Sequence, residues 1–240
     1  MTISTSNPVR SRRHDEPADP QETRPAPRAW AAAGIVAGLA GIGTIVTSRM
    51  VDAVYREDLW GDPDAIAQAV ADKAPVIAAF HVVGVIGAVA MIVFAAGLFR
   101  RLAAVSARDS LAPLVAAAGL VGTAVVTVLG TGLDTEFMFA FRAGDDAVDP
   151  SNMAFYNNWI GTIPWVWVLA GLTGLALWQA GRSGAVPRWM ARTGLVLGGL
   201  TLLLGISPLQ YMAGMTGPLW LLATALGFVL GDKAFRHGRA

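Results

Sequence analysis

The sequence has no cysteine and only three histidines, and charged residues make up 15% of its 240 residues. Without cysteine there are no disulfides, thiolate metal sites or thiol nucleophiles. His14 and His237 lie near the two ends of the chain, so His81 is the single histidine in its apolar body. A zinc, haem or di-iron site needs several ligands, which one histidine cannot supply. The sequence therefore predicts no metal or other cofactor.

Charge is scarce and nearly balanced, with a formal net charge of +1. Soluble domains carry about 25% charged residues. Here hydrophobic residues make up 54% of the chain and the mean hydropathy is +0.52, so the composition predicts a protein embedded in the lipid bilayer. The basic residues are not gathered on one element, and we therefore expect no nucleic-acid partner.

Six apolar runs are long enough to cross about 30 Å of hydrocarbon. We expect spans at residues 30–48, 75–99, 111–133, 158–178, 190–211 and 218–231, of which the last is the shortest. The pattern predicts an all-α fold, a six-helix transmembrane bundle over residues 29–232. It is preceded by a leader, residues 1–28, whose richness in Pro, Arg, Asp and Glu favours a disordered cytoplasmic segment over a signal peptide. A short basic tail, residues 233–240, follows the bundle.

The distribution of Lys and Arg predicts how the bundle is oriented. With the N-terminus inside, the segments on the cytoplasmic side contain 14 of these residues and those on the outer side contain 4. Cytoplasmic segments are the ones enriched in Lys and Arg. We therefore expect a multi-pass protein of the cell membrane with both termini in the cytoplasm, and with its acidic residues gathered in two outer loops.

Two Asp-Pro pairs and one further proline predict local structure on the outer side. Asp62 with Pro63, and Asp149 with Pro150, are typical helix-start signals. They predict a short helix in the first outer loop and a fourth helix that begins near Pro150, above the membrane. Pro164 is expected to bend that helix, because its ring removes a backbone hydrogen bond.

Glycine-rich segments recur in the first, third and fifth spans. The stretches AAAGIVAGLAG, AAAGLVGTAVVTVLGTGL and ARTGLVLGGLTLLLGISPL begin at residues 31, 116 and 191. They indicate either a threefold repeat of helical hairpins or the resemblance that Ala, Gly, Leu and Val give to any membrane helices. Glycine pairs four residues apart, such as Gly34 with Gly38, allow close helix contact. Packing within one chain is favoured over a homo-oligomer seam, which stays open.

The stretch GLDTEFMFAFRAGDD, residues 132–146, places Asp134 and Glu136 between two apolar segments. His81 is expected about 9 Å below the start of the second span, at 1.5 Å per residue, where it can approach these carboxylates. Polar residues at the ends of the fourth and fifth spans complete a candidate ring, whose members are His81, Asp134, Glu136, Asn157, Asn158, Gln210 and Tyr211.

Two interpretations of this ring are open. Ionisable groups within a membrane cost about 2.5–3.5 kcal/mol and usually face a cavity or a partner, which favours a proton-coupled or ligand-binding site. The alternative is more economical: His81 forms a hydrogen bond with a neighbouring helix, and Asp134 and Glu136 mark the boundary with water.

Three segments carry a resemblance to a known group of proteins. They are AFHVVGVIGAVAMIVFAAGLFRRL from residue 79, GLD from residue 132 and VPRWMARTGLVLGGLTLLLG from residue 186. Together they resemble uncharacterised six-span membrane proteins of high-GC Gram-positive bacteria, which form a domain family of unknown function. The resemblance spans residues 30–231 and implies the six-span topology, but it implies no activity.

Two classes of function remain from the sequence. The first is a non-enzymatic accessory, scaffolding or partner-binding role within the lipid bilayer, for which the acidic outer loops and the leader offer surfaces. The alternative is a small proton-coupled transporter or permease-like protein that uses His81, Asp134 and Glu136. A membrane enzyme ranks third, behind these two. The sequence lacks both a set of metal ligands and a recognisable nucleophile motif, which an enzyme would need.

Overall fold

The computed structural model of the protein describes residues 29–143 and 149–230, so the leader, the basic tail and Gly231 lie outside the described residues. These ranges fold into helices and contain no strand. Six helical segments are long and apolar enough to cross a membrane: Ala29–Met50, Ala74–Ala103, Ala112–Phe141, Pro150–Arg182, Arg188–Ile206 and Gln210–Leu230. The predicted all-α class and the six candidate spans are therefore confirmed.

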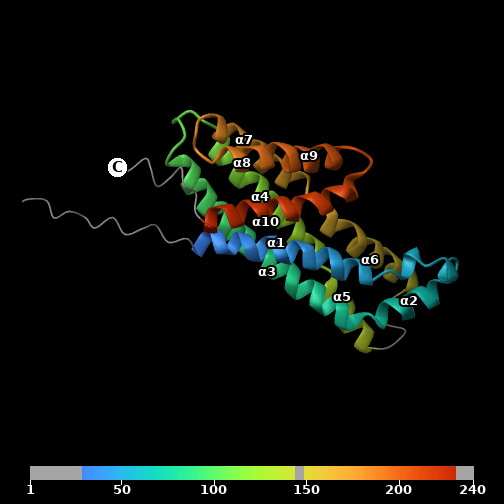
Figure 1. The fold of residues 1–240 in the computed structure, drawn as a ribbon. Coiled ribbons are helices and arrows are strands. Elements are labelled where there is room, and N and C mark those ends of the chain that lie inside the picture. The colour runs from blue at the N-terminus through green and yellow to red at the C-terminus, as the bar shows by residue number, and fades with distance from the viewer. Residues whose placement is uncertain (1–28, 144–148, 231–240) are drawn as a thin grey trace, which may run out of the picture.

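The order of the elements is shown in Figure 1. The first part contains α1 (Ala29–Met50), the 3-10 turns η1 (Ala53–Tyr55) and η2 (Glu57–Leu59), α2 (Pro63–Ala71), α3 (Ala74–Ala103) and α4 (Ala112–Gly130). The middle part contains α5 (Asp134–Ala143), α6 (Pro150–Thr162), η4 (Ile163–Trp165) and α7 (Val168–Arg182). The last part contains α8 (Arg188–Thr193), the π-helical turn η5 (Gly194–Gly198), α9 (Gly199–Ile206), η6 (Gln210–Met212) and α10 (Ala213–Leu230).

Several span boundaries differ from those expected. The third candidate span runs on to Phe141 and the fourth runs from Pro150 to Arg182, so both are longer than predicted. The fifth ends at Ile206, and the sixth begins at Gln210 instead of at residue 218. Pro218 lies inside α10, where its neighbours are helical, and does not begin it. The sixth segment thereby reaches 21 residues, long enough to cross the hydrocarbon layer.

Helix-start signals and breaks fall where the sequence predicted them. Asp62 caps α2 by accepting a hydrogen bond from the backbone N–H of Ala65 at 3.0 Å. Asp149 caps α6 by accepting one from the backbone N–H of Ser151 at 2.8 Å. Pro164 ends α6 in the 3-10 turn η4 before α7 begins.

Glycines bring the helices of the bundle into close contact. α1 packs on α3 and α10, α4 packs on α3 and α7, and α7 packs on α8, η5 and α9. A Cβ atom at Gly34 would lie 2.5 Å from the ring of Phe94, and one at Gly174 would lie 2.6 Å from the Cα of Gly198. Side chains larger than hydrogen do not fit at these crossings, so the glycines set the helix–helix distance within the chain.

Three of the candidate spans, with 30, 30 and 33 residues, are much longer than the hydrocarbon layer is thick. α3 has 30 residues and is therefore about 45 Å long, against about 30 Å of hydrocarbon. From Arg100 the helix rises about 28 Å to His81, at 1.5 Å per residue. α1 ends at Met50 and α4 at Gly130, and a Cβ atom at Gly84 of α3 would lie 2.7 Å from Thr131 and 3.5 Å from Thr44, close to these two ends. The residues beyond this level extend out of the bundle.

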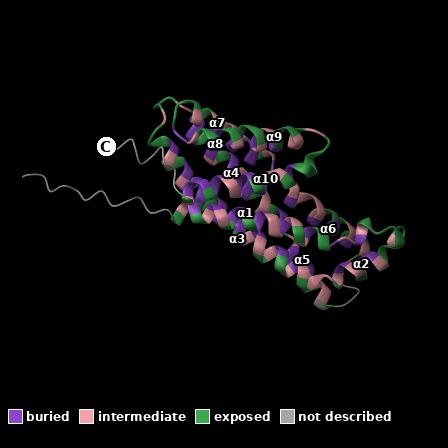
Figure 2. Ribbon diagram, in the orientation of Figure 1, coloured by how far each residue is buried: buried purple, intermediate pink, exposed green. Residues whose placement is uncertain are grey.

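These extending residues form a second unit, here called the cap. It consists of η1, η2, α2, the first turns of α3 up to His81, α5 and α6, which Figure 1 shows together at one end of the molecule. Its apolar core is separate from that of the bundle and contains Val51, Ala53, Ile66, Val70, Ile77, Phe80, Phe137, Met153, Tyr156 and Ile160. At the opposite, basic end lie Arg100, Arg101, Arg182, Arg188 and Arg192. Figure 2 shows buried positions where helices meet in both units.

Candidate functional site

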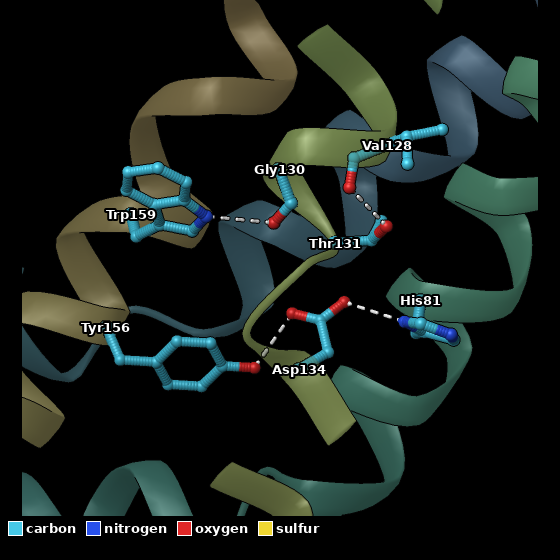
Figure 3. A network of polar contacts seen from close by, with 7 residues as sticks. All are labelled: His81, Val128, Gly130, Thr131, Asp134, Tyr156 and Trp159. Atoms are coloured by element: carbon cyan, nitrogen blue, oxygen red, sulfur yellow. Dashed lines mark hydrogen bonds and ion pairs between the residues drawn. The ribbon is translucent and has the colours of Figure 1, made fainter. Parts of the chain in front are cut away.

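Three polar side chains meet where the cap joins the bundle (Figure 3). The two carboxylate oxygens of Asp134 have different partners. Oδ1 accepts a hydrogen bond from the hydroxyl of Tyr156 at 2.9 Å, and Oδ2 lies 3.3 Å from Nδ1 of His81. Asp134 is fully buried, with 0% of its surface exposed, while the His81 side chain is 30% exposed. A buried carboxylate is thus connected to the surface through one imidazole ring.

The position of Asp134 follows from the break between α4 and α5. α4 stops at Gly130, and residues 131–133 form a turn before α5 begins at Asp134. The indole N–H of Trp159 donates to the carbonyl of Gly130 at 3.1 Å, so one backbone acceptor released by the break has a partner. The turn redirects the chain, and the first side chain of α5 points between α3 and α6 (Figure 3).

The interpretation in which Asp134 and Glu136 both mark the boundary with water is wrong for Asp134, because this side chain has no exposed surface. Glu136 is exposed, and for this residue the boundary with water stays a prediction. The contact of His81 with Asp134, at 3.3 Å, is the one expected by the proton-coupled or ligand-binding interpretation. The burial of Asp134 agrees with the first interpretation, and it depends on the packing of α5 against α6, where Phe137 stacks on Tyr156.

Tyr156 is the member of this cluster that the sequence analysis missed. In α6 the buried residues are Met153, Tyr156, Asn157 and Ile160, which is the i, i+3, i+4, i+7 pattern of one helix face. The ring of Tyr156 stacks on Phe137 with 4.1 Å between centroids and 8° between planes. A helix started at Pro150 places Tyr156 and Asn157 on that same face, so helical periodicity was the available signal.

Other polar side chains at this junction bind the backbone of the neighbouring element. Asn157 is fully buried; its side-chain nitrogen donates to the carbonyl of Val51 at 2.7 Å, and its oxygen accepts from the N–H of Val54 at 3.1 Å. The hydroxyl of Ser48 donates to the carbonyl of Ile160 at 2.8 Å. These bonds join α6 to the end of α1 and to η1.

The remaining members of the predicted ring are placed elsewhere. Asn158 is exposed and donates to the carbonyl of Ala154 in its own helix at 3.1 Å. Gln210 and Tyr211 lie on η6, at the start of the sixth segment instead of the end of the fifth, and both are exposed. Among the described residues, none of these three side chains forms a hydrogen bond with His81 or Asp134.

Tyr211 instead lines a pocket of about 530 Å³ beside the junction, and the residues that line it include Arg49, Asp52, Tyr55, Gly161 and Trp165. The absence of a side chain at Gly161 leaves room for the Tyr55 hydroxyl. Partial burial and then the neighbouring Tyr211 raise the pKa of Tyr55 above its ordinary value. His81, Asp134 and Tyr156 do not line this pocket.

The chemistry of the cluster is that of holding or exchanging a proton, since a carboxylate, an imidazole and a phenol are all groups that can carry one. In the two described ranges, no group of three or more His, Cys, Asp and Glu side chains is placed to hold a metal ion. Comparisons with protein-family models, curated proteins and solved structures find no match to this chain.

Proposed function

We propose that this protein is a non-enzymatic, multi-pass protein of the cell membrane that binds a partner protein through its cap. The termini lie in the cytoplasm and the cap on the outer side, as the distribution of Lys and Arg predicts. The observation that carries the proposal is the cap itself, a helical unit with its own apolar core, whose α2 lies between the first two candidate spans and whose α5 and α6 form the outer parts of the third and fourth.

The internal contacts of the polar side chains support a structural use for them. Asp134 binds Tyr156 and His81, and Asn157 binds both Val51 and Val54. Each of these bonds joins two elements of the cap or joins the cap to a span. Polar groups engaged in this way make the cap rigid relative to the bundle, which a docking surface needs.

The cap also exposes the residue types that protein interfaces use. Tyr55 is 55% exposed and Trp60 is 65% exposed, at the two sides of η2. The exposed side chains around them include four acidic ones, Glu57, Asp58, Asp62 and Asp64, and one basic one, Arg56, which pairs with Asp58. Aromatic residues are enriched in interface hot spots, and acidic neighbours select a partner of opposite charge. We therefore expect a partner with a basic surface.

Photo-crosslinking from position 60 tests this proposal. A photoreactive phenylalanine analogue replaces Trp60 in cells, with the same analogue at Trp189, which is 50% exposed at the basic end, as the control. We expect one discrete adduct from position 60. The partner identified in this adduct should bind the purified protein, and it should bind the variant Glu57→Gln/Asp64→Asn more weakly. Equal labelling from both positions would contradict the proposal. Partner binding that is unchanged in the Glu57→Gln/Asp64→Asn variant would contradict it as well.

A second candidate is the small proton-coupled transporter, which the 3.3 Å contact between His81 and Asp134 favours. Its weakness is the level of the cluster, about 28 Å along α3 from Arg100, at the edge of the hydrocarbon layer. Transporter sites usually lie near the bilayer midplane. Proton flux into proteoliposomes that contain the protein decides between the two. The partner-binding proposal expects the same flux as in vesicles without protein. A higher flux that disappears in the Asp134→Asn variant would establish the transporter.

A further inference from the structure

A second pocket lies at the basic end of the bundle, between the end of α7 and the start of α8. Its volume is about 490 Å³, within the range of pockets that hold small molecules. Its lining includes three arginines, Arg182, Arg188 and Arg192, and no acidic residue. Val186 and Ala191, which are 2% and 6% exposed, provide an apolar floor.

The loop that shapes this pocket is fixed by backbone hydrogen bonds. The N–H of Ala185 donates to the carbonyl of Ala180 at 3.0 Å, and that of Gly184 donates to the carbonyl of Gly181 at 3.1 Å. Gly184 has φ = +79°, so these bonds form the motif that commonly ends a helix. From α3, the guanidinium of Arg101 donates to the carbonyl of Ala185 at 3.0 Å. The pocket is therefore formed before any ligand enters.

The three arginines face this pocket with little to neutralise them. Arg188 and Arg192 are four residues apart and lie on the same side of α8. The guanidinium of Arg182 lies 5.4 Å from the ring centroid of Trp178, one turn deeper in α7. The ion pairs found among residues 29–143 and 149–230 are Arg56 with Asp58 and His81 with Asp134, so none involves these arginines.

The depth of the pocket relative to the membrane indicates where its ligand comes from. From η4 at Ile163 to Arg182 the chain rises about 28 Å if it is treated as continuous helix, nearly the thickness of the hydrocarbon layer. Arg182 therefore lies at the lipid boundary opposite the cap, with Trp178 at the depth where interfacial tryptophans are enriched. A pocket at this depth is open to lipid headgroups.

We infer that this pocket binds the phosphodiester headgroup of an anionic phospholipid. Guanidinium groups bind phosphate oxygens through paired hydrogen bonds, and three of them supply more charge than one phosphate neutralises. The apolar floor and Trp178 suit the glycerol and the start of the acyl chains. Because no acidic residue lines the pocket, a headgroup that also carries an ammonium group gains nothing from it. The pocket therefore favours anionic over zwitterionic lipid.

The test is a binding titration of the purified full chain in detergent, with dioctanoyl phosphatidylglycerol as the probe. The variant is Arg188→Gln/Arg192→Gln, and the control is Arg100→Gln/Arg108→Gln, which removes the same charge from exposed positions outside the pocket. At about fivefold for each arginine, we expect the pocket variant to bind about 25-fold more weakly and the control to stay within about twofold of the parent chain.

Two comparison ligands separate the sources of a phosphate. Dioctanoyl phosphatidylcholine is expected to bind at least tenfold more weakly than dioctanoyl phosphatidylglycerol. Inorganic phosphate at millimolar concentration is expected not to displace the phosphatidylglycerol. Equal loss in the two double variants would overturn the site in favour of general charge attraction. Displacement of phosphatidylglycerol by inorganic phosphate would show that the pocket binds free phosphate and not a lipid headgroup. These outcomes leave the partner-binding proposal untouched, because its test uses the opposite end of the molecule.

Discussion

The cap and the bundle satisfy their buried polar groups in different ways. In the bundle, the hydroxyls of Thr123 and Thr201 donate to carbonyls four residues earlier, at 2.9 and 2.7 Å, while the bond from Thr173 to the carbonyl of Ala116, at 2.9 Å, joins α7 to α4. In the cap, Asn157 reaches Val51, more than 100 residues away, and Tyr156 reaches Asp134 on another helix. Close packing at glycines is the main feature of the bundle, and hydrogen bonds between elements far apart in the sequence are the main feature of the cap.

The difference follows from the surroundings of the two units. Helices in hydrocarbon satisfy their backbone internally and gain little hydrophobic free energy from one another, so small residues and close contact hold them together. The cap has short helices with irregular turns between them, whose free backbone groups need partners from elsewhere in the chain. Substitutions at glycines should therefore damage the bundle, and substitutions of polar side chains should loosen the cap.

The largest effect is expected from Gly174→Val. Even a single Cβ at this position would lie 2.6 Å from the Cα of Gly198, so α7 and the π-helical turn η5 must separate. Overpacking of this kind costs about 3 kcal/mol or more. The measurement is the folded yield and melting temperature in detergent. Gly199→Ala is the control, because its nearest atom would be a flexible leucine methyl at 3.7 Å; a similar loss in both would contradict the packing argument.

A smaller and more local effect is expected from Asn157→Ala. The substitution leaves the carbonyl of Val51 and the N–H of Val54 without their partner, at a cost of about 2 kcal/mol. We expect faster hydrogen exchange in η1 and α6, with unchanged protection in α1 and α10. Asn158→Ala is the matched control, since that exposed side chain bonds only to its own helix. Uniform loss of protection across the chain would show that cap and bundle are one cooperative unit.

Tyr156→Phe removes a single hydrogen bond and keeps the ring stacked on Phe137. The carboxylate of Asp134 then loses its Tyr156 donor while retaining His81, and the expected cost is about 1 kcal/mol. Hydrogen exchange at the start of α5 should report it. Tyr211→Phe is expected to change nothing there, because Tyr211 is exposed and lies on η6. If both variants behave alike, the cluster does not stabilise the cap.

The smallest effect is a pH dependence at the start of α6. The hydroxyl and then the backbone N–H of Ser151 hold the pKa of Asp149 below its ordinary value. A lowered pKa contributes stability above the ordinary aspartate pKa, about 4, and the contribution is lost as the pH falls below it. Protection of the first amides of α6 should therefore decrease between about pH 5 and pH 3, after correction for intrinsic exchange.

Asp149→Asn supplies the control for that pH dependence. Asparagine also caps helices but does not titrate in this range, so the variant should keep its protection as the pH falls. If the variant shows the same decrease, a different group is responsible.

Much of the secondary structure could be predicted because its signals are local. Apolar runs give the spans, Asp-Pro pairs give the starts of α2 and α6, and Pro164 gives the break before α7. The prediction was weaker where a boundary depends on a neighbour. Gln210 and Tyr211 belong to the sixth segment, whose start could not be separated from the end of the fifth by hydropathy alone.

The candidate site was predicted only in part, for the same reason. His81 and Asp134 could be named because ionisable groups within apolar sequence are costly, and their contact followed from matching levels in two helices. Tyr156 was missed because a tyrosine at a membrane boundary is ordinary until a buried carboxylate is placed against it.

The sequence by itself determined that the chain is helical and that six segments suit lipid, because both depend on properties summed over neighbouring residues. Tertiary structure decided which polar residues are buried. Asp134 and Glu136 are two residues apart, and one is fully buried while the other is exposed. Successive residues of a helix point in different directions, and only the packing of α5 between α3 and α6 selects the side that becomes interior.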